Sequence, residues 1–236
     1  MQFFFPIFRF VAVLLTAILM LPSFALDNYR AVYDLEIRGV SAGTVVYEGF
    51  FTDITYRIDT VGKPSTAASM LGFGEIRESV KGLLQAGKVQ PQFYQRSMQG
   101  KADYALEYKF TPEKNQIAVK KAGADTALSY EQDQKPLDTI SMVLQSVVDI
   151  ENSSLPKEYT LITEDRMRVY QIEKMPDQKW KSRDGKSFSV MVYRQRNGDR
   201  ENVVYFAKEP LRLVRLEQLR KGKRHFLMNL TDYRTL

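Results

Sequence analysis

The sequence contains no cysteine. Disulfide bonds, thiol nucleophiles and cysteine-ligated metal sites are therefore excluded. Attachment of a lipid to a cysteine at the start of a mature chain, as in lipoproteins, is excluded for the same reason. The stability of the fold must accordingly come from a hydrophobic core without covalent cross-links.

Histidine is almost as scarce, because His225 is the single one in 236 residues. One histidine cannot build a two-histidine metal site, and a Ser-His-Asp triad would have to use this residue. The sequence has no G-x-S-x-G nucleophile motif and no Walker loop, and GFGEIR at Gly72 lacks the third glycine of a dinucleotide loop. We therefore predict no cofactor, no metal site and no enzymatic activity.

Long apolar runs are confined to the N-terminus. A single charge, Arg9, precedes an apolar run of about 12 residues, short of the roughly 20 that span a bilayer, and small residues follow at Ser23 and Ala25. We predict a signal peptide over residues 1–25, cleaved after Ala25; the alternative is a retained anchor. The pattern indicates export to the bacterial periplasm and no membrane span after cleavage.

Nothing in the rest of the chain marks a second domain. Residues 26–236 contain no internal repeat and no Pro/Ser-rich linker, so we expect one β-rich domain. The charge is uneven: residues 26–150 hold 14 basic and 16 acidic residues, a net of −2, whereas residues 151–236 hold 19 and 12, a net of +7. This asymmetry indicates a basic surface that attracts anionic partners.

The dominant periodicity is two. Runs such as YRAVYDLEI at Tyr29 and ADYALEYKF at Ala102–Phe110 alternate apolar and polar residues between turn signals, which is typical of half-buried antiparallel strands. Asn197-Gly198 is the strongest hairpin signal. Helical spacing occurs after Asp138, and more weakly after Ser65. We predict a single curved antiparallel sheet or half-open β-barrel of about 10–12 strands, with one or two helices on its concave face.

The basic stretch Leu211–Phe226 has no coherent helical face, because its leucines scatter around the helix circumference. As two strands joined by the turn RKGK, it forms a hairpin whose charges lie on the turn and the outer face. The predicted basic surface contains Arg212, Arg215, Arg220, Lys221, Lys223 and Arg224. A contact with anionic lipid or polysaccharide is the functional alternative, whereas no recognised motif supports nucleic-acid binding.

Aromatic residues are abundant, with 13 Tyr and 14 Phe. Several tyrosines fall on the inward faces of predicted strands, and a curved sheet lined in this way can enclose an apolar ligand; an ordinary aromatic core is the alternative. Residues near the glycines at 72 and 74 would form a lip over such a cavity. The predicted cavity lining comprises Tyr33, Tyr56, Met70, Leu71, Phe73, Tyr104, Tyr108 and Leu144.

Paired carboxylates are the remaining catalytic possibility, since glycoside hydrolysis needs only two of them across a sugar. Asp53 with Asp59, or Glu75 with Glu78, are candidates. All four lie at positions predicted to face solvent, and 28 acidic residues produce such pairs by chance. A carboxylate-dependent polysaccharide hydrolase is therefore the third functional hypothesis.

Several motifs in order carry a resemblance to a known family. They are YDLEIRGVSAGTV with Gly39 and Gly43, PQFYQRSMQG at Pro91, PLDTISMVLQ with Asp138 and Ser141, and the closing basic hairpin after Pro210. Together they resemble the secreted bacterial family known as domain of unknown function 3108. The resemblance implies a half-barrel like that of periplasmic lipoprotein carriers, with helices on the concave face. The chain departs from the family where Phe206 and Ala207 replace a common Trp.

From these features we expect a periplasmic, non-enzymatic protein that binds a lipidic or apolar cell-envelope component in a curved β-sheet. An interaction protein with a solid core, docking on an envelope protein or peptidoglycan, is the alternative.

Overall fold

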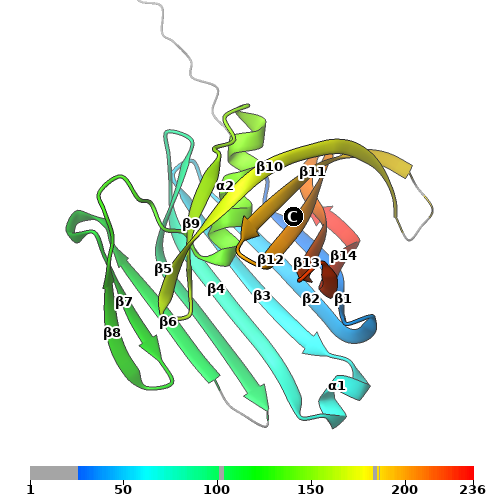
Figure 1. Cartoon of the computed structure of the whole chain (residues 1–236), viewed down its shortest axis with the longest axis horizontal. Coiled ribbons are helices and arrows are strands. Elements are labelled where there is room, and N and C mark those ends of the chain that lie inside the picture. The colour runs from blue at the N-terminus through cyan, green and yellow to red at the C-terminus, as the bar shows by residue number, and fades with distance from the viewer. Residues whose placement is uncertain (1–25, 101–103, 183–184, 186) are drawn as a thin grey trace, which may run out of the picture.

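The computed structural model describes residues 26–100, 104–182, 185 and 187–236; the predicted signal peptide lies outside them. The described residues form one antiparallel sheet of 14 strands (Figure 1). The strands are β1 (Tyr29–Ile37), β2 (Val40–Phe51), β3 (Thr55–Pro64), β4 (Phe73–Gln85), β5 (Lys88–Gly100), β6 (Tyr104–Thr111), β7 (Gln116–Lys121), β8 (Ala124–Ser129), β9 (Glu158–Thr163), β10 (Arg166–Lys181), β11 (Ser187–Asn197), β12 (Arg200–Lys208), β13 (Leu211–Arg220) and β14 (Lys223–Thr235).

The order of the strands shows two meanders joined in the middle. Strands β1 to β8 follow one another, as do β9 to β14, and β14 pairs with β1. Strands β8 and β9 end the sheet and do not pair with each other, so the sheet curves without closing. The predicted half-open barrel is confirmed, with more strands than expected. The edge strand β8 is almost wholly exposed, and its sequence therefore lacks the alternation that marks the others.

Alternation and turn chemistry explain the strands. In β6, Leu106, Tyr108 and Phe110 are buried while the residues between them are exposed. The basic stretch forms the β13–β14 hairpin, as predicted. The two central residues of its turn, Lys221 and Gly222, have positive φ angles of 51° and 72°. In a two-residue hairpin turn this left-handed conformation matches the twist of the flanking strands.

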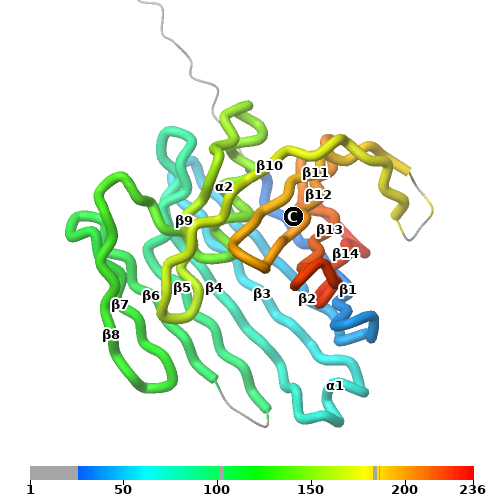
Figure 2. The backbone as a smooth tube through the Cα atoms, in the orientation of Figure 1, coloured from blue at the N-terminus to red at the C-terminus, as the bar shows by residue number. Residues whose placement is uncertain are grey.

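Helix α2 (Thr139–Glu151) crosses the concave side of the sheet, between its two halves (Figures 1 and 2). Asp138 caps its N-terminus, accepting hydrogen bonds from the backbone N–H groups of Ile140 and Ser141, both at 2.9 Å. Leu137 exchanges backbone hydrogen bonds of 2.9 Å with β9, donating to Thr160 and accepting from Ile162. The start of α2 is thus tied to the edge of the sheet.

The helix divides the interior. Ile140, Leu144 and Val148, at helical spacing, pack into a cluster with β3 to β7. Val143 and Val147 face the other way, toward a cluster formed by β1, β2 and β11 to β14. One helix therefore contributes to two packed regions, and its second face meets the half of the sheet that contains the first and last strands, β1 and β14.

Side chains of β6 and β7 join one part of the sheet to the β9–β10 hairpin at its other end. The β9–β10 hairpin lies against β6 (Figure 2), where the hydroxyl of Tyr104 donates to the Glu164 carboxylate at 2.6 Å and that of Tyr108 to the Glu164 carbonyl at 2.9 Å. The Lys121 ammonium lies 2.8 Å from the same carboxylate. Burial raises the pKa of Glu164, but hydrogen bonds from Lys121 and Tyr104 outweigh it, and the net pKa is lowered.

The short helix α1 (Thr66–Met70) connects β3 to β4 at one end of the sheet, capped by the Ser65 side chain as predicted. None of its residues is buried. Among the described residues, no helix is both long enough and apolar enough to cross a membrane.

Candidate functional site: a tyrosine-lined cavity

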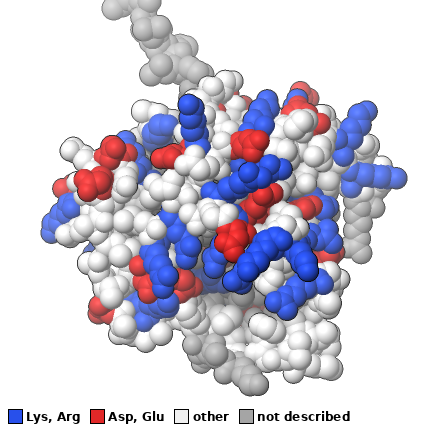
Figure 3. Space-filling view, viewed as in Figure 1, with Lys and Arg blue, Asp and Glu red and all other residues white. Residues whose placement is uncertain are grey.

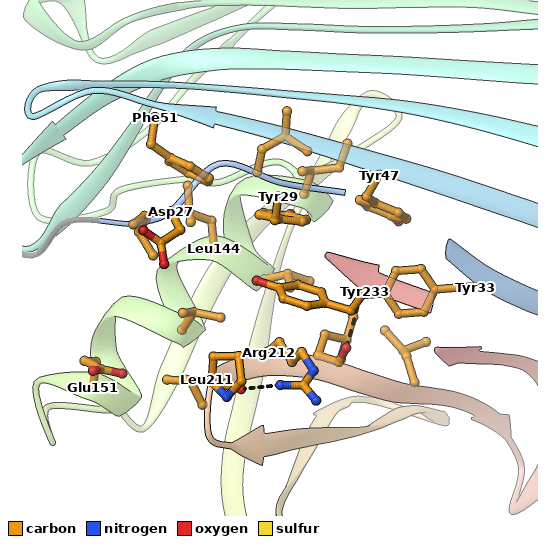
Figure 4. Close-up of a pocket in the computed structure, with 18 of the residues that line it drawn as sticks. Asp27, Tyr29, Tyr33, Tyr47, Phe51, Leu144, Glu151, Leu211, Arg212 and Tyr233 are labelled. Atoms are coloured by element: carbon orange, nitrogen blue, oxygen red, sulfur yellow. Dashed lines mark hydrogen bonds between the residues drawn. The ribbon is translucent and has the colours of Figure 1, made fainter. Parts of the chain in front are cut away.

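A cavity of about 890 Å³ lies beside α2, against the central strands β1, β2, β13 and β14 (Figure 4). Its deeper lining is mainly apolar and aromatic. Charged and exposed residues mark the side where it meets solvent: they come from the start of the described chain, the end of α2 and the β12–β13 turn. These exposed residues are Asp27, Glu151, Lys208 and Glu209.

Four tyrosines form one wall of the cavity (Figure 4). The ring of Tyr29 stacks on Phe51 at 6.1 Å and on Tyr233 at 5.8 Å, and Tyr33 meets Tyr47 edge to face at 5.4 Å. Burial is the main cause that raises the pKa of Tyr29, Tyr33 and Tyr47 well above the usual value. These phenols are therefore neutral at physiological pH and act as hydrogen-bonding groups rather than bases.

The hydroxyls differ in how they are satisfied. The Tyr33 hydroxyl donates to the backbone carbonyl of Leu213 at 3.1 Å. The hydroxyls of Tyr29, Tyr47 and Tyr233 form no hydrogen bond with any described residue, although all three residues line the cavity. A buried phenol normally finds a partner, so these groups remain available to a bound molecule.

Arg212 is a cation of the cavity wall that lies against aromatic rings. Its guanidinium lies 5.0 Å from the ring centre of Tyr233 and 5.9 Å from that of Phe188, and it donates to the Pro210 carbonyl at 3.0 Å (Figure 4). The expectation that Arg212 belongs to the exposed basic surface is therefore wrong. Its charge suggested solvent, but a planar guanidinium packs well on aromatic faces.

A buried polar chain anchors α2. Ser141 donates to the Asp138 carboxylate at 2.5 Å, and its hydroxyl lies 2.8 Å from that of Tyr56 on β3. Asp138 and Ser141 are fully buried. Burial raises the pKa of Asp138 to about 6, although hydrogen bonds from Ser141 and Ile140 oppose the shift. The Asp-x-x-Ser motif thus fixes the helix that bounds the cavity.

The structure brings together two of the eight predicted lining residues. Tyr33 and Leu144 line the cavity. Tyr56, Tyr104 and Tyr108 do not, because they lie with β3 to β7 on the other side of α2, where the core is filled. Their inward direction was predicted correctly, but the helix separates them from the hollow part of the interior.

The predicted lip is also wrong. Met70, Leu71 and Phe73 are exposed by 83%, 72% and 56%, and none lines the cavity. They lie beside α1, where the end of β3 pairs with the start of β2 at Gly43. The exposed side of the cavity, in contrast, adjoins the start of β1 and the end of β2, the opposite end of the same strands.

The remaining predicted basic residues lie on or near the surface. Arg220, Lys221, Lys223 and Arg224 are exposed around the β13–β14 turn. Arg215 is half-buried, paired with the carboxylate of Glu217 and 5.7 Å from the ring centre of Tyr205. Figure 3 shows Lys and Arg side chains interspersed with Asp and Glu on the face of the molecule that it draws.

Three of the four carboxylates considered for hydrolysis have structural partners. Asp59 lies 2.8 Å from the Arg57 guanidinium, and Glu78 accepts a hydrogen bond of 2.6 Å from the Tyr94 hydroxyl. Glu75 is paired with Arg77. Of the four residues, Glu78 lines the cavity. Within the described part of the chain, no group of three or more His, Cys, Asp or Glu side chains has the arrangement of a metal site.

Comparison with known proteins identifies the fold. No protein-family model matches the sequence, and no curated protein matches it. The structure is similar to the crystal structure of a beta-barrel-like protein of domain of unknown function DUF1849 from Brucella abortus, with a TM-score of 0.54 and 12% sequence identity, over 89% of this chain and 98% of that chain. At this identity the similarity shows a shared barrel-like fold and no activity.

Proposed function

We propose that this protein is a non-enzymatic binding protein of the bacterial periplasm that holds a lipidic or other apolar envelope component beside α2. The cavity of about 890 Å³ is the observation that carries the proposal. Its size falls within the range of about 300–1,000 Å³ typical of small-molecule sites, and its apolar lining with a few polar groups is typical of them too.

The hollow favours ligand binding over the alternative of an envelope-docking protein with a solid core. Protein interiors pack about as densely as organic crystals, and side chains that line an empty space lose the contacts they would otherwise make. Both core clusters contain fully buried side chains, so the chain packs tightly around the space beside α2. A ligand that fills this space restores the missing contacts.

The chemistry of the lining supports binding rather than catalysis. The tyrosine phenols retain their protons because burial raises the pKa of each. Asp138, the buried carboxylate that caps α2, is occupied by the N-cap and Ser141. The lining thus offers contact area and hydrogen-bond donors in place of an activated nucleophile.

The compartment in this proposal follows from residues 1–25, whose composition is that of a signal peptide. The proposed kinship with the family of domain of unknown function 3108 rests on the ordered motifs. Asp138 and Ser141 anchor α2, which gives the Asp-x-x-Ser motif a structural role. This role supports the proposed kinship.

Titration with the uncharged fluorophore Nile red tests the proposal. The chain from Leu26 to Leu236 is expected to give a saturable fluorescence increase at one site per chain, reversed by dodecanol, because both molecules are apolar and fit a cavity of this type. A signal that rises without saturation, or that dodecanol does not reverse, would count against a ligand cavity.

A further inference from the structure

Arg212 has hydrogen-bonding capacity that the protein leaves unused. A guanidinium carries five N–H donors, and one hydrogen bond, to the Pro210 carbonyl, joins the Arg212 side chain to the described residues. Its Nε atom is buried and has no hydrogen-bond partner among the residues that the structure describes. Buried polar groups in native structures are almost always satisfied, so this donor calls for an acceptor that the chain itself does not supply.

The charge of Arg212 is likewise unmatched. No carboxylate lies within 4.0 Å of it among the described residues, whereas its neighbour in the lining, Lys208, lies 2.8 Å from Asp177. The aromatic rings of Tyr233 and Phe188 hold the guanidinium in place but accept no conventional hydrogen bond. The cavity thus contains one positioned cation without a counter-ion.

Arg212 has suitable neighbours for binding an anion. The hydroxyl groups of Tyr29, Tyr47 and Tyr233 are unpaired donors in the same lining. Arg212 also lies two residues from Pro210, an exposed residue of the lining, while Leu144, Leu216 and Met228 supply apolar surface. Polar donors and apolar side chains in one cavity match a molecule with a charged head and an apolar tail.

We propose that the cavity binds an anionic amphiphile, with Arg212 holding its oxyanion headgroup and the apolar lining holding its tail. This inference rests on the proposed function and specifies its ligand class. The planar fork of a guanidinium binds carboxylate and phosphate oxygens through paired N–H donors. A fatty acid and a phosphorylated lipid share this chemistry, and the experiment below separates them.

The test is displacement of Nile red by dodecanoate, dodecyl phosphate and dodecanol, which share one tail. A hydrogen bond to a charged group contributes about 1.5–3 kcal/mol, so at least one of the two anions is expected to bind about 10-fold or more tightly than the alcohol. The anion with the higher affinity identifies the headgroup as carboxylate or phosphate.

Arg212→Gln is expected to remove this preference. Its affinity for the favoured anion should fall about 10-fold or more, while dodecanol binding stays within about 2-fold and demonstrates that the variant is folded. Arg215→Gln is the matched control on the same strand, and it should behave as wild type because Arg215 is paired with Glu217 outside the cavity lining.

The outcomes separate the two claims. Equal affinity for alcohol and both anions in the wild type, or an anion preference that survives Arg212→Gln, overturns the role of Arg212 while leaving the ligand cavity intact. Failure of Nile red and dodecanol to bind the wild-type protein overturns the proposed function, and the headgroup assignment with it.

Discussion

Replacing Val143 and Val147 together with tryptophan is expected to weaken Nile red binding about 30-fold. Both valines are half-buried and line the cavity from one face of α2, so the indole rings extend into the space that the ligand needs. Displacing about 80 Å² of apolar ligand contact, at about 25 cal/mol per Å², costs about 2 kcal/mol, which corresponds to about 30-fold in affinity.

The protein itself should tolerate these substitutions. Filling an existing cavity adds packing contacts without forcing neighbours apart, so the Tm is expected to stay the same or to rise. Val169→Trp is the control, because Val169 is an exposed valine of β10 that does not line the cavity. If the double variant binds Nile red as tightly as wild type does, the ligand does not occupy the space beside α2.

A second large effect is expected in the pH dependence of stability. In the folded protein, burial raises the pKa of Asp138 to about 6, from the usual value of 3.8 for an aspartate. Ionisation is thus less favourable in the folded state, and the contribution of Asp138 to stability is complete at low pH and lost as the pH rises through about 6. Over about two pH units at about 1.4 kcal/mol each, the loss is about 3 kcal/mol.

Asp138→Asn isolates this contribution. Asparagine is as good an N-cap as aspartate and does not titrate, so the free energy of unfolding of the variant should rise relative to wild type by about 3 kcal/mol between pH 4 and pH 7. Urea unfolding of both proteins at a series of pH values measures the difference between their free energies of unfolding. Groups that titrate alike in both proteins cancel in this difference. Glu164, whose lowered pKa acts in the opposite direction, is one of them.

Asp138→Ser provides the control for this experiment. It replaces the carboxylate by a second N-cap that does not titrate, and it should flatten the pH dependence in the same way despite a lower overall stability. A pH profile that remains parallel to wild type in both variants would show that Asp138 has the same pKa in the folded and unfolded chain.

Local structure was predictable because its causes are local. The period of two in β1 and β6, the caps at Ser65 and Asp138, and the turn after Arg220 all follow from neighbouring residues in the sequence. The division of the interior was not predictable in this way. Alternation gives the direction of a side chain, but it does not say which side of α2 that side chain will meet.

The site depends on a contact between the first and the last strand of the sheet in sequence order. Strand β1 pairs with β14, and Tyr29 consequently stacks on Tyr233. Nothing in the neighbourhood of either residue in the sequence indicates this pairing. Arg212 likewise lies over the rings of Tyr233 and Phe188, neither of which is near it in the sequence, and its charge alone predicts exposure.

The most direct test of the central claim is the native mass of the protein purified, without denaturation, from bacterial cells that express the full-length chain. We predict an excess over the mass of the polypeptide, equal to one molecule that organic solvent extracts and that carries an apolar tail and an acidic headgroup. A polypeptide mass alone, unchanged after incubation with envelope lipids, would contradict the account.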